Sequence, residues 1–313
     1  SFVEYGQLAI AAQRQRREIE ELRARTPADG VITGLATINS THFGDAASQA
    51  AVAINDYSVL AGTQGFYHHR KIDRILDVAA GKGLPVVMFT EGGGGRPGDT
   101  DVTTWVAGLN LPTFSKWAGM SGKSLRLAVA NGYCFAGNAA LFGAADIRIA
   151  TRQSWIGMAG PAMIEGGGLG SFDATEIGPA QLQADIGVVD LLVEDEDEAV
   201  KQVKKALGYF QGEIADFGCA DQTRLASLLP EDRRYSYHVR KVIEVIADTD
   251  SFLELSGPYG GAIVTGFIRI GGKPLGLIAN DCRVLGGAID VEAAGKAARF
   301  MRLCNDHGLP LLS

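Results

Sequence analysis

The feature that most constrains the fold of this 313-residue chain is an internal repeat. The segment IANDCRVLGG matches the earlier AINDYSVLAG, and KAARFMRLCNDHGLPLL matches KIDRILDVAAGKGLPVV. Three matching pairs are each separated by 225 positions: Asn55 and Asn280, Lys71 and Lys296, Pro85 and Pro310. A shared offset over roughly 60 positions indicates a duplication. We therefore expect two related domains, at residues 1–213 and 214–313.

Short β-branched runs alternate with helical periodicity along the chain, which indicates an α/β fold. We expect strands at residues 31–38, 51–56, 84–90, 124–132 and 146–150. We expect helices at residues 5–25, around 71–79, at 135–145 and in the acidic segment 193–205.

Bulk composition narrows the class of protein. The net charge of −7 and the pI of about 5.3 argue against nucleic acid as a partner. No apolar run approaches the roughly 20 residues of a membrane helix, and no signal peptide opens the chain. We therefore expect a cytoplasmic protein with no membrane partner. The four cysteines form no CxxC pair, so we expect no metal site.

Glycine is the outlier in composition, with 41 residues gathered in clusters. Two clusters follow buried strands directly: EGGGGRP at residues 91–97 and NGYCFAGNAAL at residues 131–141. Residues without Cβ let the backbone approach a ligand, and two N–H groups converging from separate segments form an oxyanion hole. The alternatives are a flexible surface loop at Gly92 to Gly95 and a tight packing site at the second cluster. The first cluster matches neither a P-loop nor the dinucleotide-binding fingerprint.

Several segments resemble a known family. Asn131-Gly132-Tyr133, the small residues that open the following helix, and Ala145-Asp146-Ile147 resemble the signature of the crotonase superfamily. The duplication, the opening SFVEYG, DGVITG, TGFIRIGGKPLGLIAND and LGGAIDVEAAGKAARFMRLC resemble the carboxyltransferase subunit or domain of biotin-dependent acyl-CoA carboxylases, the acetyl-/propionyl-CoA carboxylase group. The resemblance covers nearly the whole chain. It implies an α/β fold of two tandem crotonase-like ββα-spiral halves, with the second truncated.

The resemblance also implies a reaction and its site. A carboxyl group moves from carboxybiotin to the α-carbon of an acyl-CoA, the biotin ureido nitrogen takes the α-proton, and two backbone N–H groups stabilise the enolate. No side chain has to act as a strong base. Carried onto this sequence, the backbone N–H donors come from Gly93, Gly94 or Gly95 in the first loop and from Gly137 and Asn138 in the second. Substrate contacts are expected from Arg96, Phe135 and Ala136.

The chain departs from the usual family pattern at three places. The first loop reads Gly93-Gly94-Gly95-Arg96 where the family usually has Gly-Gly-Ala-Arg. Asn138 stands where the family usually has a second glycine, so it retains an N–H and adds bulk. The stretch from Trp155 to Gly178 differs from the commoner ITGP-type pattern, which indicates a subgroup with its own acyl preference.

Other polar residues have simpler interpretations. For Arg96, a structural ion pair competes with a contact to the phosphates of CoA. Asp99 and Asp101 are interpreted as solvated turn residues. The five histidines are interpreted as surface or structural residues: His42, His68, His69, His238 and His307.

The resemblance implies partners: an acyl-CoA substrate, biotin carboxylase and biotin carboxyl carrier domains or subunits, and a homo-oligomer built as a dimer or a trimer of dimers. Ser313 corresponds to Met88, so the second copy stops before its own glycine loop. In the family that loop holds biotin, and we therefore predict that the chain alone does not transfer carboxyl groups.

Two other functions remain open from the sequence. A crotonase-type hydratase or thioester hydrolase would place an acid after the second loop, where Glu165 and Asp173 stand, but such enzymes are expected to have a single copy of the fold. A non-catalytic fragment that supplies oligomer contacts is the third alternative.

Overall fold

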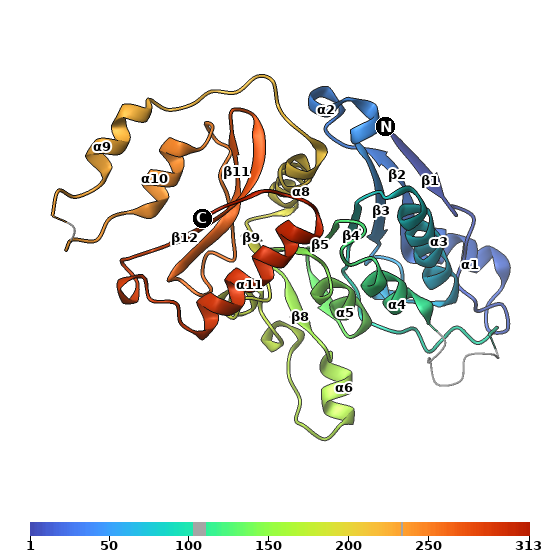
Figure 1. Ribbon diagram of the computed structural model, residues 1–313. Coiled ribbons are helices and arrows are strands. Elements are labelled where there is room, and N and C mark those ends of the chain that lie inside the picture. Colours follow the sequence, from blue (N-terminus) through green and yellow to red (C-terminus); the bar gives the residue numbers. More distant parts are fainter. Residues whose placement is uncertain (103–110, 233) are drawn as a thin grey trace. The chain divides into compact units, whose positions relative to one another are not determined.

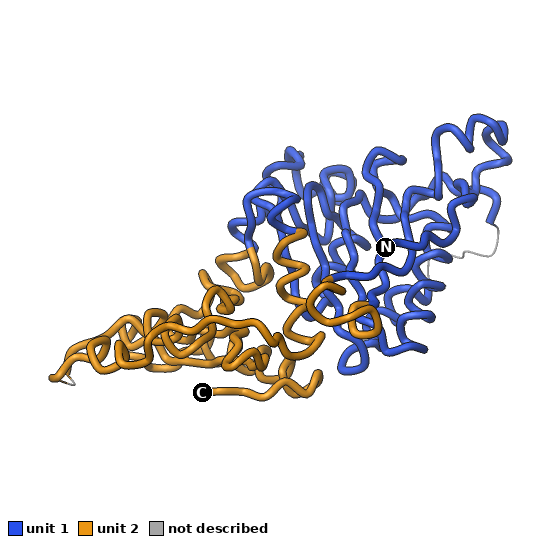
Figure 2. The backbone as a smooth tube through the Cα atoms, turned by 90° about the horizontal axis from the view of Figure 1, so that it is seen from above, with its two compact units in different colours: residues 1–38, 49–183, 192–199 blue, residues 39–48, 184–191, 200–313 orange. Residues whose placement is uncertain are grey.

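The computed structural model describes residues 1–102, 111–232 and 234–313 (Figure 1). The chain divides into two compact units, which Figure 2 colours separately. Unit 1 contains residues 1–38, 49–183 and 192–199, and unit 2 contains residues 39–48, 184–191 and 200–313. The predicted boundary between residues 213 and 214 follows the sequence repeat rather than this division, and it stays a prediction.

A seven-stranded sheet in the order β1-β2-β3-β4-β5-β7-β9 carries the first half of the chain. Its strands are β1 (Phe2–Tyr5), β2 (Val31–Thr37), β3 (Gln49–Asn55), β4 (Val86–Phe89), β5 (Arg126–Ala130), β7 (Ile147–Thr151) and β9 (Leu191–Val193). The strands from β3 to β7 are parallel neighbours, so their carboxyl ends meet at one edge of the sheet. A separate parallel pair joins β6 (Tyr133–Phe135) to β8 (Trp155–Gly157).

The second sheet has four strands in the order β10-β11-β12-β13. They are β10 (Leu253–Leu255), β11 (Ile263–Ile270), β12 (Lys273–Asn280) and β13 (Leu311–Leu312).

The helices of the described residues fall between these strands. They are α1 (Ile19–Arg25), α2 (Ser40–Ala47), α3 (Phe66–Lys82), α4 (Pro112–Gly119), α5 (Gly137–Gly143), α6 (Pro161–Gly166), α7 (Ala180–Asp185), α8 (Glu196–Gln211), α9 (Leu225–Leu228), α10 (Val239–Ile246) and α11 (Val291–Asp306).

The pairing pattern occurs twice, as the sequence repeat predicts. β1 pairs antiparallel with β2, β2 antiparallel with β3, and β3 parallel with β4. β10, β11, β12 and β13 pair in the same three ways. In each copy a long helix, α3 or α11, connects the third strand to the fourth.

A difference in one connection explains why the repeat changes its offset. Thr33 of β2 and its counterpart Thr265 of β11 are 232 positions apart, whereas the later pairs are 225 apart. The first copy passes from β2 to β3 through residues 38–48, and the second turns through Gly271 and Gly272. The first copy therefore has the longer connection. Beyond it, the matching residues of the two copies are separated by the smaller, constant offset.

Each unit has its own apolar core. In unit 1, α3 and α4 pack on β2, β3 and β4 (Figure 1). The core residues that these elements share include Val31, Ala53, Ile72, Leu76, Met88 and Trp117. In unit 2, α10 packs on β11 and β12 through Val239, Ile243, Val264, Ile268 and Leu277.

Most predicted elements correspond to observed ones, but the N-terminal helix is wrong over most of its length. Phe2–Tyr5 is a strand, and the helix begins only at Ile19. Asp101 accepts hydrogen bonds from the Arg14 and Gln15 N–H groups at 2.7 and 2.9 Å, which fixes this segment by tertiary contacts. Helical periodicity is a local preference, and these long-range contacts override it.

Candidate active site

The first glycine loop lies at the carboxyl end of β4. The Gly92 N–H donates to the Tyr133 carbonyl at 2.7 Å, and the Phe135 N–H donates to the Gly92 carbonyl at 2.9 Å. These two bonds tie the loop to β6, the strand that leads into the second loop. They hold the loop at Gly92, while Gly93 and Gly95 lie at the surface.

The second glycine loop is the turn from β6 into α5. Ala136 caps this helix with φ 52° and ψ −119°, a conformation that residues with a side chain rarely adopt. Such strain is retained where the surrounding contacts fix the backbone, and it concentrates at functional sites. A Cβ built on Gly94 would lie 2.7 Å from the Ala136 Cβ and 3.7 Å from the Gly137 nitrogen. The two loops therefore lie directly against each other.

Asn138 joins the two loops through its side chain. Its Oδ1 accepts a hydrogen bond from the Gly94 N–H at 3.0 Å, and its Nδ2 donates to the Glu91 carbonyl at 3.1 Å. The residue is fully buried. The prediction concerned the Asn138 backbone N–H, whereas this side-chain bridge joins residues 44 and 47 positions apart, which no local pattern marks.

The N–H groups of the first loop differ in their availability. The Gly93 N–H donates to the Ala61 carbonyl at 3.0 Å, and the Gly94 N–H is held by Asn138. Within the described part of the chain, the Gly95 N–H has no hydrogen-bond acceptor. Gly137 opens α5, so its N–H has no acceptor one turn earlier in the helix. Of the predicted donors in the first loop, Gly95 is thus the available one.

A cavity of about 570 Å³ lies beside both loops. Gly95 and Gly137 line it together with the polar or charged residues Gln64, His69, Arg96 and Asp99. Its apolar wall is formed by Pro97, Val102, Leu111, Phe114 and Met163. The cavity therefore combines a few polar groups with a predominantly apolar surface, the usual composition of a site for a small organic ligand.

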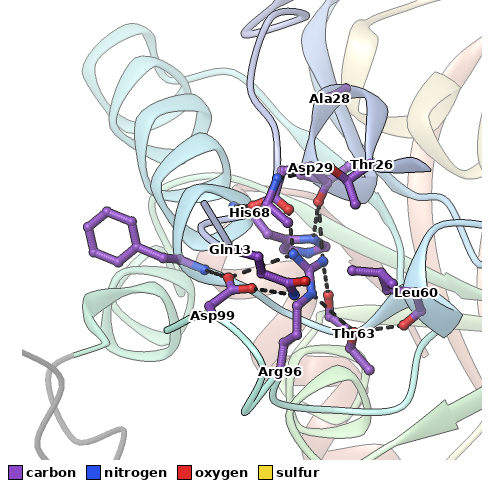
Figure 3. Close-up of polar contacts among 12 residues, drawn as sticks. Gln13, Thr26, Ala28, Asp29, Leu60, Thr63, His68, Arg96 and Asp99 are labelled. Carbon is purple, nitrogen blue, oxygen red and sulfur yellow. Dashed lines mark hydrogen bonds and ion pairs between the residues drawn. The ribbon is translucent and has the colours of Figure 1, made fainter. Parts of the chain in front are cut away.

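Arg96 lines the same cavity and ties the first loop to neighbouring segments (Figure 3). Its side chain is only 5% exposed and forms an ion pair with Asp29, which is fully buried. The Arg96 Nη2 also donates to the Thr63 carbonyl at 2.6 Å. Burial raises the pKa of Asp29, and the neighbouring Arg96 charge opposes that rise. The structural ion pair is thus observed, while a contact of Arg96 with CoA stays a prediction.

The interpretation as a solvated turn residue is wrong for Asp99, whose side chain is 4% exposed, whereas Asp101 is a half-buried turn residue. The Asp99 carboxylate accepts hydrogen bonds from the Phe66 N–H at 2.8 Å and from Gln13 Nε2 at 3.1 Å (Figure 3). Asp101 holds the Arg14 and Gln15 N–H groups. Both carboxylates fasten the loop to neighbouring segments, because they satisfy backbone donors that have no partner in a helix or sheet.

The histidines of this unit are buried in hydrogen-bonded positions. His69 Nδ1 lies 2.9 Å from the Thr113 hydroxyl, which donates to Asp73 at 2.5 Å. Burial lowers the pKa of His69 to about 4, with a smaller contribution from Arg96. The ring is therefore neutral near pH 7 and adds no positive charge to the cavity.

Glu91 precedes the first loop and carries a buried carboxyl group. Its Oε1 accepts a hydrogen bond from the Asn131 N–H, at the start of the second loop segment. Burial raises the pKa of Glu91 to about 7, and the hydrogen bond from Asn131 opposes the rise. The carboxyl group therefore connects the two segments, and its burial favours the protonated form.

The remaining predicted residues lie around the cavity rather than along its wall. The Phe135 ring stacks on Tyr133 at 5.9 Å and packs near Gly160. Ala136 faces Gly94. Substrate contacts by Phe135 and Ala136 stay predictions. Neither Glu165 nor Asp173 lines the cavity, because Glu165 is exposed and Asp173 caps a 3-10 turn through the Thr175 N–H.

A second cavity, of about 410 Å³, lies within unit 2 and includes Phe43, Tyr209, Phe217 and Arg269. The Arg269 guanidinium donates to three carbonyl oxygens, those of Gly208, Gly212 and Gly272, at 2.7 to 2.9 Å. The Arg269 guanidinium thus makes hydrogen bonds that stabilise the fold. Across residues 1–102, 111–232 and 234–313, no cluster of His, Cys, Asp and Glu suits a metal ion, and no helix has the length and apolar character to cross a membrane.

Comparison with known proteins identifies the family. Residues 1–313 match the carboxyl transferase domain. The chain is 30% identical to the methylmalonyl-CoA carboxyltransferase 12S subunit of Propionibacterium freudenreichii subsp. shermanii, over 93% of this chain and 55% of that subunit. The chain thus spans about half the length of the curated relatives it matches.

Solved structures agree with this assignment. A single-chain, multi-domain long-chain acyl-CoA carboxylase is 53% identical with a TM-score of 0.96, over 100% of this chain and 31% of that one. The transcarboxylase 12S structure is 28% identical with a TM-score of 0.82, over 99% and 61%. The predicted α/β fold with crotonase-like halves is confirmed by these neighbours. The chain belongs to the carboxyl transferase domain family.

Proposed function

We propose that this chain is the carboxyltransferase portion of a biotin-dependent acyl-CoA carboxylase and that it binds the acyl-CoA. Carboxybiotin supplies the carboxyl group when its carrier is bound. The chain binds the thioester, orients its α-carbon and stabilises the negative charge that develops on the thioester oxygen. Family membership and the names of its relatives support this proposal.

The observation that carries the proposal is the convergence of Gly95 and Gly137 on one cavity. Both residues present backbone N–H groups without a protein acceptor in the described residues. An enolate oxygen placed between them would receive two hydrogen bonds that strengthen as its charge develops. The rigid support behind the loops, from Asn138 and Arg96, means that little reorganisation is needed.

We propose a long acyl chain as the substrate class. The wall formed by Val102, Leu111, Phe114 and Met163 offers apolar surface next to the two N–H groups. The relative with 53% identity is a long-chain acyl-CoA carboxylase. Burial of methylene groups contributes about 0.8 kcal/mol each, so a wall of this kind favours longer chains.

The remaining features of the proposal are partners, assembly and location. The partners are a biotin carboxyl carrier and a biotin carboxylase. The assembly is a homo-oligomer of this chain. A neighbour is described as a hexamer, which supports an oligomer. A cytoplasmic location is consistent with free thiols at Cys134, Cys219, Cys282 and Cys304.

The test is carboxylation of palmitoyl-CoA by the complete carboxylase that contains this chain. We expect incorporation of labelled bicarbonate that avidin abolishes, and a higher kcat/KM for palmitoyl-CoA than for acetyl-CoA. Hydration of enoyl-CoA or hydrolysis of the thioester without carboxylation would contradict the proposal. Equal kcat/KM values for the two substrates would contradict only the chain-length part.

A further inference from the structure

The cavity contains a polar side chain without a partner, Gln64. The residue is 2% exposed, and its Nε2 is buried with no hydrogen-bond acceptor in the described chain. Several other buried polar atoms also lack partners, but Gln64 is the residue among them that lines this cavity. Buried amide groups are normally hydrogen-bonded, so an unpaired one beside a ligand cavity calls for an acceptor.

The carboxamide lies against the second glycine loop. A Cβ built on Gly137 would be 2.4 Å from Gln64 Oε1 and 3.4 Å from its Cδ. The end of the Gln64 side chain therefore occupies the space that a side chain on Gly137 would need. This places the carboxamide beside the Gly137 backbone, where the thioester oxygen is proposed to bind.

The contacts that connect Gln64 to the neighbouring loop segment are made by its main chain and not by its side chain. The Gln64 N–H donates to the Gly94 carbonyl at 2.7 Å, and the Gln64 carbonyl accepts from the Arg96 N–H at 3.0 Å. Both bonds are made by main-chain atoms, so a change of side chain does not remove their donor or acceptor. The carboxamide Nε2 has no hydrogen-bond partner within the described residues.

We propose that the Gln64 carboxamide is a third hydrogen-bond donor to the thioester oxygen of the acyl-CoA, beside Gly95 and Gly137; this inference rests on the function proposed above. Rotation by 180° about the last side-chain bond exchanges the amide nitrogen and oxygen with little change in shape. That rotation brings the NH₂ group to the face that Gln64 turns toward Gly137. A substrate oxygen there supplies the acceptor that the protein does not.

The first test replaces the donor while keeping the length of the side chain. In the complete carboxylase, Gln64→Met is expected to lower kcat about 10- to 100-fold, because one donor to the developing charge is lost. The Kd for palmitoyl-CoA is expected to change less than about threefold, because the bond strengthens as charge develops. The control is Gln49→Leu, which removes a half-buried glutamine on β3, and its kcat is expected to match that of the unmodified enzyme.

The second test uses Gln64→Glu and a pH profile. The introduced carboxyl group can donate a hydrogen bond only when protonated, and burial raises the pKa of such a group. We expect the ratio of mutant to unmodified kcat to rise as pH falls, whereas the ratio for Gln64→Met stays flat. This test also decides the matter if Gln64→Met does not fold, because a structural role predicts no pH-dependent recovery.

The outcomes separate the two proposals. An unmodified enzyme without avidin-sensitive carboxylation overturns the proposed function. An active unmodified enzyme with Gln64→Met kcat within twofold, or with a flat Gln64→Glu ratio, overturns the role of Gln64 alone. A loss of palmitoyl-CoA affinity with kcat unchanged would indicate uniform binding and would likewise overturn it.

Discussion

Asn138 Oδ1 accepts the Gly94 N–H at 3.0 Å, so a side chain of the second loop fixes the backbone of the first. The same carboxamide donates to the Glu91 carbonyl at 3.1 Å. An amide side chain can satisfy a donor and an acceptor together. Asn138 thereby fulfils, with one fully buried residue, the hydrogen-bonding needs of two backbone groups in the first loop.

Asn138→Ala should destabilise the chain, because it leaves the Gly94 N–H and the Glu91 carbonyl buried without partners. We expect a loss of about 1–3 kcal/mol in the free energy of unfolding. The control is Asn131→Ala, whose side chain bonds Glu196 at an exposed position, and we expect it to cost less than half as much. Urea denaturation measures both. Equal losses in the free energy of unfolding for the two variants would contradict a stabilising role of the Asn138 bridge.

Gly94 and Gly95 should respond differently to alanine. Gly94 has φ +89°, and a Cβ there would lie 2.7 Å from the Ala136 Cβ, so Gly94→Ala should cost about 1–3 kcal/mol or more. Gly95 lacks a positive φ, and a Cβ there meets open space. Gly95→Ala should therefore leave the free energy of unfolding unchanged or raise it by about 0.4–1 kcal/mol.

The same contrast bears on one departure from the pattern that the resemblance implies. The resemblance implies alanine where Gly95 stands, and the structure has room for it. Urea denaturation of the two variants in parallel is the measurement. If Gly94→Ala proved as stable as Gly95→Ala, the close approach of the two loops would be contradicted.

Asp29→Asn should be strongly destabilising, because it leaves the buried Arg96 charge without its full partner. Removing one partner of a buried ion pair typically lowers the free energy of unfolding by about 3–5 kcal/mol. The control is Asp77→Asn, which removes a partly exposed ion pair with Lys116 and should cost at most about 1 kcal/mol. Thermal and urea unfolding compare the two. A loss for Asp29→Asn no greater than for Asp77→Asn would rule out the pair as the anchor of the loop.

The sequence predicted those features that leave a local or periodic signal. Strands β2 to β5 and helix α3 could be predicted because their apolar patterns are long and regular. The glycine loops could be predicted because each follows a buried strand directly. The duplication predicted the second sheet, whose strands pair in the same order as the first.

What the sequence missed depends on contacts between distant residues. Asp99 is 86 positions from Gln13, and no local pattern marks their hydrogen bond. Residues 5–18 look helical, but Asp101 holds their backbone in another conformation. The side chains of Gln64 and Asn138 were not predicted to matter to the loops, because their importance lies in which backbone groups face them in three dimensions.

Glu91 should make stability depend on pH. In the unfolded chain its carboxyl group has the ordinary pKa of 4.5, while burial raises the pKa to about 7 in the folded chain. Between these values the folded chain binds more protons, so the free energy of unfolding falls as pH rises from 4.5 to 7. Above pH 7 both states are ionised, and the full penalty, about 3 kcal/mol, remains.

Glu91→Gln removes this titration, and its amide oxygen can still accept the hydrogen bond from the Asn131 N–H. We expect the variant to be more stable than the unmodified chain by about 3 kcal/mol at pH 8 and of equal stability near pH 4. Urea denaturation from pH 4 to pH 8 is the measurement, with Glu165→Gln as the control because that carboxyl group is exposed. Parallel pH curves for Glu91→Gln and the unmodified chain would mean that the Glu91 carboxyl group ionises in the folded protein as readily as in the unfolded one.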